Sequence, residues 1–394
     1  MSTSHRAAFA ATAVLGLGLG LLADASAVTR TVGPGMQYAT PCKAIAAALS
    51  GDLINIYPGT YSGDVCGIYA SNVTIRGVNG RPKIDAAGRN AMGKATWVVV
   101  GNNVTVDNVE MLGAKVPDLN GAALRLEGTH FTLRRSFLHD NQNGILSGAN
   151  LNSDIVIENS EFGHNGYGTG QTHNLYIGNV RKLTFRYNFS HDANVGHNLK
   201  SRAQTNIIFY NRFSSLRPGE LGSTAAGQPS YEIDLPNAGT SYIIGNVIQQ
   251  PAANQNPSLI AYGEEGATNP GKNLYVVNNT FLNDNTSRGN FVLVGAGVTT
   301  PILLQNNIFS GTGTLSNQVN PVQMTNYRSV APGFVNMARY DLRPTPNAMV
   351  IDAGSTPAAG LVPVAGYKHV ALGMVRPVTG KLDIGAYEAT SPAP

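Results

Sequence analysis

A short pattern recurs through the middle of the chain and constrains the fold more than any other feature. Each copy is a run of β-favouring residues, then a polar residue that is usually Asn, then a bulky apolar residue. These apolar anchors lie 24 to 35 residues apart: Phe137, Phe162, Phe189, Phe213, Ile248, Phe281 and Phe309. A strand repeat with a nearly constant period is typical of solenoids, in which each unit buries its apolar face only by stacking on its neighbours.

A second short strand is expected between successive copies, for example at 122–126, 174–177, 198–201, 232–235 and 291–294. Two or three strands in a coil of about 25 residues predict a parallel β-helix. The recurring amides predict a ladder of stacked side chains at one turn, formed by Asn159, Asn188, Asn211, Asn246, Asn279 and Asn307. The expected fold class is therefore all-β, with a single chain wound into a solenoid.

Composition agrees with this fold and excludes others. Charged residues are 13% of the chain and there are 45 Gly, which argues against helical bundles and coiled coils. Because 42% of the residues are hydrophobic, intrinsic disorder is excluded as well. The net charge of +4 slightly favours an anionic partner, but no run rich in Lys and Arg indicates nucleic acid.

The ends of the chain differ from its middle. Residues 1–27 resemble a signal peptide, because Arg6 precedes the apolar stretch 7–22 and Ala25-Ser26-Ala27 forms a cleavage site. We expect residues 28–310 to form the β-helix, with a capping helix at 41–49 that has Pro41 in its first turn, and 311–394 to form C-terminal coils and an irregular capping tail.

Export has consequences for location and for cysteine chemistry. The expected location is outside the cell or in the periplasm, and the mature chain has no second apolar run long enough to span a membrane. We expect it to be a monomer. Because an oxidising compartment permits disulfides, the only two cysteines, Cys42 and Cys66, are expected to form one.

Candidate functional residues concentrate on three adjacent coils. Six of the eight His lie between positions 130 and 197. When the second strands are stacked, Leu175, Leu199 and Ile233 share the buried side. Alternation then predicts one outward strip of Asn174, Tyr176, Asn198, Lys200, Glu232 and Asp234, extended by Arg202. At the edge where the chain enters these strands, His173, His197 and Tyr231 are expected to stack, and His191 is a further candidate for substrate binding.

This set of residues suits β-elimination on a uronate, the sugar of acidic polysaccharides. The reaction needs a base for the C5 proton, a group that neutralises the sugar carboxylate, and an acid at the leaving oxygen. Lys200 is the candidate base, on the expectation that Arg202 and His197 lower its pKa. Arg202 would bind the carboxylate, and Tyr231 or His197 would supply the proton. Calcium, the one cofactor suggested, would bind oxygen atoms of Glu232, Asp234 and Asn198.

Motifs near both ends carry a resemblance to a known superfamily. These motifs are similar to those of pectate-lyase-like right-handed parallel β-helix proteins. They are the segment Gly51-Asp-Leu-Ile-Asn-Ile-Tyr-Pro-Gly-Thr-Tyr61, the Asn-containing coils, Ile351-Asp-Ala-Gly and Asp383-Ile-Gly-Ala-Tyr-Glu388. The resemblance implies a right-handed β-helix over nearly the whole mature chain. This superfamily includes lyases, hydrolases, epimerases and non-catalytic surface proteins, so the fold alone does not decide the activity.

One coil resembles a narrower group. Asn198-Leu-Lys-Ser201 followed by Asn206-Ile-Ile-Phe-Tyr-Asn211 is similar to the coil that carries the base in β-helix lyases of the alginate lyase and chondroitinase B type. This resemblance implies the base role for Lys200. The chain departs from that group in two places. Members of the group have acidic calcium ligands just before the Lys, where this chain has the uncharged residues 193–196. They have an Arg on the next coil, where this chain has Glu232 and Asp234.

Two other functions stay open. Glu232 and Asp234 are two residues apart, so their carboxyl groups could form the pair of a glycoside hydrolase, and an epimerase is a related possibility. The second alternative is a non-catalytic β-helix that binds exopolysaccharide at a cell surface. The favoured prediction is a secreted lyase that cleaves an acidic polysaccharide.

Overall fold

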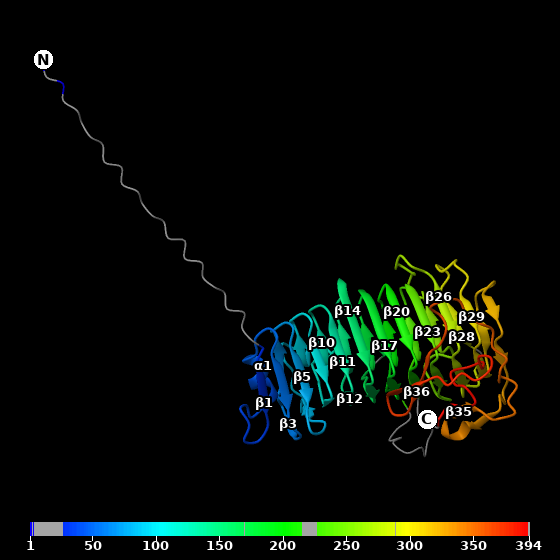
Figure 1. Cartoon of the computed structure of the whole chain (residues 1–394), viewed down its shortest axis with the longest axis horizontal. Coiled ribbons are helices and arrows are strands. Elements are labelled where there is room, and N and C mark those ends of the chain that lie inside the picture. The colour runs from blue at the N-terminus through cyan, green and yellow to red at the C-terminus, as the bar shows by residue number, and fades with distance from the viewer. Residues whose placement is uncertain (2, 4–26, 169, 215–226, 288, 393–394) are drawn as a thin grey trace.

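The computed structural model describes residues 1, 3, 27–168, 170–214, 227–287 and 289–392. The predicted signal peptide falls almost entirely outside these residues. Figure 1 shows coils stacked side by side into an elongated cylinder, with α1 (Pro41–Ala46) at one end. Within the described ranges, strands of successive coils pair only in parallel in three long sheets, here named A, B and C. Because such strand-to-strand crossovers are right-handed, the chain forms a right-handed parallel β-helix, as predicted.

Sheet A has twelve strands in chain order: β1 (Thr29–Val32), β2 (Leu53–Ile56), β5 (Thr74–Gly77), β8 (Thr105–Asp107), β11 (Phe131–Arg134), β14 (Asn150–Glu158), β17 (Val180–Arg186), β20 (Thr205–Phe209), β23 (Thr240–Ile244), β26 (Leu274–Val277), β29 (Leu303–Gln305) and β32 (Val322–Met324). Sheet B has eleven: β3 (Thr60–Ser62), β6 (Lys83–Asp85), β9 (Glu110–Leu112), β12 (Phe137–His139), β15 (Glu161–Gly163), β18 (Phe189–His191), β21 (Arg212–Ser214), β24 (Val247–Gln250), β27 (Thr280–Asn283), β30 (Ile308–Gly311) and β33 (Tyr327–Arg328).

Sheet C has ten strands: β4 (Cys66–Ile68), β7 (Ala95–Val99), β10 (Ala122–Leu126), β13 (Asn143–Ser147), β16 (Leu175–Ile177), β19 (Leu199–Ser201), β22 (Ile233–Leu235), β25 (Ile260–Tyr262), β28 (Asn290–Val294) and β31 (Thr314–Ser316). The repeats found in the sequence are strands of sheets A and B, and the second strands are those of sheet C. One continuous apolar core lies between the three sheets, built from residues such as Trp97, Phe162, Phe213 and Phe281.

The turn from sheet A to sheet B explains why the repeat contains Asn. At this turn one residue adopts a left-handed conformation, as Tyr187 and Asn278 do, and the next residue points its side chain inward. The inward amides then bond from coil to coil, because the Nδ2 of each Asn donates to the Oδ1 of the next along Asn188, Asn211, Asn246, Asn279, Asn307 and Asn326. The predicted ladder is therefore present, with one correction: Asn159 occupies the left-handed position, and Ser160 takes the ladder position beside it.

The N-terminal end is covered as predicted. Ala44 and Ile45 of α1 belong to the main core, and Pro41 lies in the first turn of the helix. The helix ends at Ala46, three residues before the predicted end. Cys42 and Cys66 form the predicted disulfide, which joins α1 to β4 with 5.8 Å between their Cα atoms.

The C-terminal segment, from residue 329 to 392, runs back along the side of the β-helix. It contains β34 (Phe334–Asn336), the 3₁₀ turn η1 (Met337–Arg339), β35 (Asp341–Pro344), β36 (Ala365–Lys368) and β37 (Leu372–Val375). Its contacts reach far back in the chain, since Asn159 Nδ2 donates to the carbonyl of Ala371 and Asn278 Nδ2 to that of Asp383. Figure 1 shows β35 and β36 beside the coils. The tail thus covers a flank of the cylinder.

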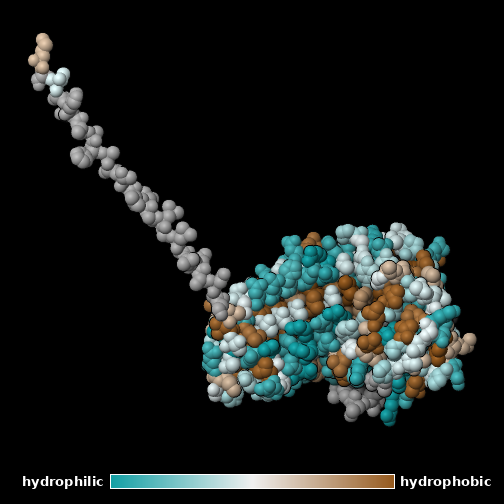
Figure 2. Space-filling model, in the orientation of Figure 1, coloured by the Kyte–Doolittle hydropathy of each residue, from teal (hydrophilic) through white to brown (hydrophobic). Residues whose placement is uncertain are grey.

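Exposed hydrophobic side chains gather in the last third of the chain, and Figure 2 shows hydrophobic patches over the C-terminal coils. They include Val319, Val330, Met349, Val364 and Val375. No helix in the described part of the chain is long and apolar enough to cross a membrane.

Candidate functional site

One outward row on sheet C carries the predicted chemistry. The strands pair in the predicted register, with Tyr176 beside Lys200 and Lys200 beside Asp234. Leu175, Leu199 and Ile233 are fully buried on the opposite side, in the core. The same row continues toward the N-terminal coils through Leu146, Arg125 and Val98. Lys200 therefore lies in the middle of an extended strip.

The Lys200 ammonium lies between two carboxylates. Its Nζ is 2.8 Å from Asp234 Oδ2 on the next coil and 2.7 Å from Glu265 Oε1 one coil further on. Asp234 is nearly buried, whereas the Glu265 side chain is 48% exposed. Lys200 thus has one fixed anionic partner beneath it and one partner that faces solvent.

Arg202 extends this arrangement by one more cation. Its Nη2 lies 2.5 Å from Glu265 Oε2, so the two oxygens of Glu265 contact two different cations. The guanidinium is also held by Tyr176, whose hydroxyl accepts from Nε at 2.8 Å, and by Asn237, whose Oδ1 accepts from Nη1. These contacts fix the orientation of Arg202 independently of Glu265.

A row of rings lies at the edge of the strands, as predicted. His173 and His197 stack with their ring centroids 4.8 Å apart, and Tyr231 follows at 5.4 Å from His197. The Nδ1 atoms of both His accept backbone N–H groups, from His197 and Tyr231 respectively. In a neutral ring the proton is then on Nε2, and that atom of His197 lies 3.3 Å from Asp234 Oδ2. Asp234 therefore joins His197 to Lys200.

The electrostatics of Lys200 differ from the prediction. Burial alone would lower the pKa of this ammonium, but Asp234 and Glu265 outweigh burial and raise the pKa above its ordinary value. The expected lowering of the Lys200 pKa by Arg202 and His197 is therefore wrong, because the carboxylates of Asp234 and Glu265 contact Nζ directly. Lys200 is charged at neutral pH.

The pKa values of two neighbours complete the picture. Burial would raise the pKa of Asp234, but hydrogen bonds and charges from His197 and Lys200 lower it, so Asp234 is ionised. Burial, with the charges of Asp234 and Glu264, raises the pKa of Tyr231 to about 12. The Tyr231 phenol thus keeps its proton over the working pH range and can donate it. His173 is nearly buried, and burial holds its pKa well below the usual value.

Three residues assigned to the outward strip are instead buried. Asn174, Asn198 and Glu232 are fully buried and form a second ladder, in which Asn174 Nδ2 donates to Asn198 Oδ1 at 2.8 Å and Asn198 Nδ2 donates to Glu232 Oε2 at 2.5 Å. Each of them immediately precedes its strand, at the turn from sheet B to sheet C. The alternation of side chains holds only within a strand, so extending it into the turn gave the wrong face.

These positions do not fit the predicted calcium site. Asn198 and Glu232 bond to each other inside the ladder, while Asp234 points to Lys200 and His197 on the outer face. The three oxygens therefore do not converge, and no group of three His, Cys, Asp or Glu in the described ranges could hold a metal ion. Burial raises the pKa of Glu232 to about 8, against the opposing hydrogen bond from Asn198. A carboxyl group that is protonated at neutral pH is a poor calcium ligand.

His191 belongs to a different face of the molecule. It ends β18 in sheet B, where its two ring nitrogens lie 2.7 Å from Asp192 Oδ2 and 3.2 Å from Glu161 Oε1. Its neighbour Phe189 packs with Tyr367 and Ala371 of the C-terminal segment. Because His191 is nearly buried there, the prediction that it contacts the same substrate as Lys200 is not supported by its position.

Glu265 is the charged residue of this cluster that was not predicted from the sequence. It follows β25 within Gly263-Glu264-Glu265-Gly266, where both glycines have positive φ. Two adjacent acids between glycines, one coil after Asp234, were a usable signal in a chain so poor in charge. What the sequence did not reveal is that this turn reaches back over two coils.

Shallow hollows continue the Lys200 row toward the N-terminal coils. One, of about 350 Å³, is lined by residues that include Lys94, Arg125 and Leu146, and a second, of about 330 Å³, includes Tyr167 and Thr172. They share Asp118 and Asn120, so they adjoin. The first hollow therefore lies on the outer face of sheet C, and the second lies beside it, over residues that precede the sheet C strands.

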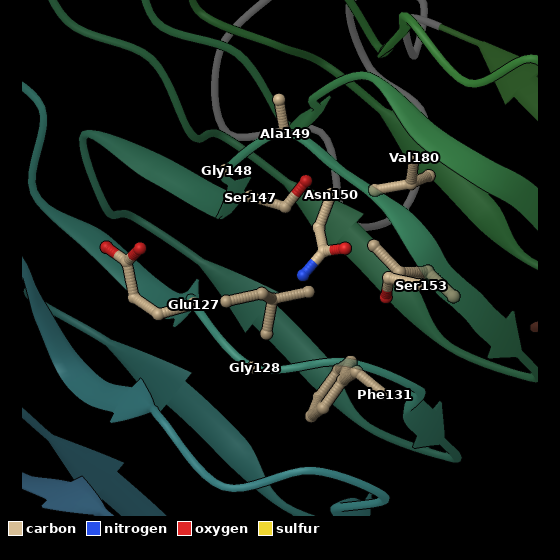
Figure 3. A pocket seen from close by; sticks show the side chains of 11 residues that line it. Glu127, Gly128, Phe131, Ser147, Gly148, Ala149, Asn150, Ser153 and Val180 are labelled. Atoms are coloured by element: carbon tan, nitrogen blue, oxygen red, sulfur yellow. The ribbon is translucent and has the colours of Figure 1, made fainter.

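A third cavity has a different character. It is about 40 Å³ in volume, and Figure 3 shows it between Glu127, Phe131, Asn150 and Ser153. This is room for a few water molecules only. It contains none of the predicted site residues, so we do not assign it to the site.

Comparison with known proteins bears on the fold. The structure is similar to that of pectate lyase Pel9A, with a TM-score of 0.60 and 15% sequence identity over 92% of this chain and 96% of the other. The chain therefore shares the pectate-lyase-like β-helix fold, as its motifs indicated.

Weaker likenesses exist to pectin methylesterase PemA from Erwinia chrysanthemi, with a TM-score of 0.39 and 13% identity over 76% of this chain and 93% of the other. A likeness to the A-module of mannuronan C-5 epimerase AlgE6 from Azotobacter vinelandii has a TM-score of 0.34 and 13% identity, over 73% of this chain and 93% of the other. These two scores are too low to support an argument. No protein-family model matches the sequence, and no curated protein matches it.

Proposed function

We propose that this protein is a secreted polysaccharide lyase that cleaves a uronate-containing polymer by β-elimination. One observation carries the proposal: Lys200 and Arg202, on the outer face of sheet C, together bind a single carboxylate, at present that of Glu265. A uronate presents the same group beside the C5 proton that elimination removes. The pectate lyase that shares the fold supports this class of chemistry by analogy only.

The residues have distinct roles in this proposal. Arg202 binds the uronate carboxylate and favours charge build-up on it as the C5 proton leaves. Lys200, as a neutral amine, removes that proton, and Asp234 at 2.8 Å stabilises the ammonium that forms. Tyr231, whose pKa is raised to about 12, donates a proton to the leaving oxygen. The hollows along sheet C would hold further sugars of the chain.

Asp234 has opposing effects on the base. The same anion that stabilises the product ammonium raises the pKa of Lys200, so only a small fraction is neutral at pH 7. However, a base with a high pKa is better matched to a weakly acidic carbon acid. The proposal therefore implies a lyase that works best at alkaline pH.

The test is a panel of acidic polysaccharides, namely polygalacturonate, alginate and hyaluronan, each with calcium or with a chelator. Elimination is expected to raise ultraviolet absorbance and reducing ends together on at least one polymer. The chelator arm tests calcium, for which the predicted ligands do not converge.

Other outcomes would identify another function. Reducing ends without absorbance would indicate a hydrolase, although the proposed pair is unsuitable because Glu232 is buried in the ladder while Asp234 faces outward. Inversion at C5 without cleavage would indicate an epimerase. Binding with no chemical change would indicate a non-catalytic polysaccharide-binding protein.

A further inference from the structure

Glu265 occupies the place that the proposed function gives to the substrate carboxylate. Its two oxygens lie 2.7 Å from Lys200 Nζ and 2.5 Å from Arg202 Nη2. The Glu265 carboxylate thus bridges the two cations, with one oxygen atom on each. We propose that Glu265 is an internal substitute for the substrate, which closes the site when it is empty and leaves when a uronate carboxylate binds. This inference rests on the proposed function and adds a regulatory residue to it.

The contacts around the two cations permit this exchange. Lys200 keeps Asp234, and Arg202 keeps Tyr176 and Asn237, when Glu265 leaves. Both cations therefore stay in position to receive another carboxylate. Because one anion replaces another, the balance of charge between Lys200, Arg202, Asp234 and the bound carboxylate does not change.

Glu265 itself is placed to move. Its side chain is 48% exposed, against 4% for Asp234, the other partner of Lys200. It lies in a turn between Gly263 and Gly266, where Glu264, Glu265 and Gly266 are all exposed. Because the Glu265 carboxylate is half exposed, solvent screens its attraction to the two cations, and a competing carboxylate can take its place.

The structure also supplies a matched control. Glu264 is the adjacent residue, and none of the ion pairs found among the described residues joins it to Lys200 or Arg202. Replacing Glu264 removes a nearby negative charge without opening the two-cation site. Glu264→Gln and Glu265→Gln therefore separate a general charge effect from the specific removal of the substitute.

The first readout is binding of a short oligogalacturonate and a short oligomannuronate, measured by calorimetry, with an uncharged oligosaccharide as the reference. Since a ligand that must displace a competing group binds more weakly, Glu265→Gln is expected to tighten binding of an anionic oligomer about fivefold. Glu264→Gln should leave Kd within about twofold, and the uncharged oligomer should respond to neither change. Equal tightening by both variants, unchanged or weaker binding in Glu265→Gln, or no anionic binding to any protein would overturn the inference.

The second readout is the pH profile on a polymer that the wild type degrades. If Glu265 leaves on binding, the substitution alters only the free enzyme, so the kcat/KM profile should move to lower pH as Lys200 loses an anionic partner, while the kcat profile stays in place. A shift of both profiles would mean that Glu265 stays in the complex, and the inference would fail. If Glu265→Gln tightens binding but no elimination product forms, the substitute role of Glu265 stands and the proposed lyase activity fails. If elimination occurs but binding is unchanged in Glu265→Gln, the lyase activity stands and the substitute role fails.

Discussion

The chemistry of the Lys200 residue is set by the two carboxylates beside it. Asp234 is buried and also bonds to His197, whereas Glu265 is exposed and shared with Arg202. A lysine held this way is a cation in the free protein, and it becomes a base only when its proton is lost to solvent. Substitutions of Lys200 and the pH dependence of the activity therefore test whether Lys200 is the base.

The first prediction concerns substitution of the base. Lys200→Ala should abolish elimination, and Lys200→Arg should not restore it, because Arg stays protonated and cannot remove the C5 proton. Initial rates on the best polymer of the panel measure this, with circular dichroism to confirm the fold. A largely preserved kcat with a higher KM in Lys200→Arg would mean that the residue only binds substrate.

The second prediction concerns the pH dependence of the wild type. Because the pKa of Lys200 is raised by Asp234 and Glu265 against burial, kcat/KM should keep rising into the alkaline range as the ammonium deprotonates. The profile is measured with substrate well below KM. A plateau reached below neutral pH would assign the base to a group of lower pKa, with His197 the next candidate.

The third prediction concerns the buried carboxyl group of Glu232. Its pKa is raised to about 8, so the folded protein holds a proton that the unfolded chain releases near pH 4.3. Stability from this group is complete below the unfolded value and is lost as pH rises through the folded value. Glu232→Gln should therefore raise Tm at pH 8 more than at pH 5, by a difference worth about 1 kcal/mol or more. An equal effect at both pH values would contradict the raised pKa.

At the scale of elements, the amide ladders and the disulfide hold the coils together. Each amide ties one turn to the next with several hydrogen bonds in the core, where an unsatisfied group costs about 1–3 kcal/mol. The disulfide closes a loop of 24 residues and fixes α1 on the first coils. A cross-link of that length contributes about 3 kcal/mol in the chain-entropy account.

The fourth prediction tests one rung of the ladder. Asn246 donates to Ile208 O and Asn279 Oδ1 and accepts from the backbone and side chain of Asn211. Asn246→Ala leaves these partners unsatisfied and should cost about 3 kcal/mol or more of unfolding free energy. Denaturant titration measures it, with the exposed Asn152→Ala as control. Equal stability of the two variants would show that the ladder contributes little.

Some features followed from the sequence, and others could not. The period was predictable from the spacing of the apolar anchors. The inward Leu199 and the outward Lys200 were predictable because both depend on alternation inside a strand. Asn174, Asn198 and Glu232 were misplaced because alternation stops where a turn begins, and the turn length is not visible in the strand pattern. Glu265 was missed since its contact with Lys200 spans 65 residues and depends on how two coils stack.

At the scale of the whole molecule, the C-terminal segment acts as a brace along the flank. Its centre is a buried pair, in which Arg376 Nε donates to Glu388 Oε1 at 2.6 Å. The other guanidinium nitrogens donate to the carbonyls of Asp383, Gly385 and Ala386. This explains the Asp383-Ile-Gly-Ala-Tyr-Glu388 motif, whose backbone curls around one arginine.

The fifth prediction concerns this brace. Arg376→Ala leaves Glu388 buried without its partner, which costs about 3–5 kcal/mol for a pair of this kind. We expect protease cleavage within 330–392 while the three sheets stay intact, read by mass spectrometry of the fragments. The exposed Arg339→Ala is the control and should resemble the wild type. Cleavage spread evenly over the coils would show that the segment and the β-helix unfold together.

The brace also sets an order of events during synthesis. Tyr210 Oη accepts a hydrogen bond from the backbone N–H of Val364, which lies 154 residues later in the chain. A ribosome makes the middle coils long before it makes the residues that cover them. Until residues 361–371 emerge, the aromatic side chains around Phe189 and Tyr210 lack the apolar partners that cover them in the folded protein. This later segment therefore covers the centre of the molecule, and its removal should affect the middle of the β-helix first.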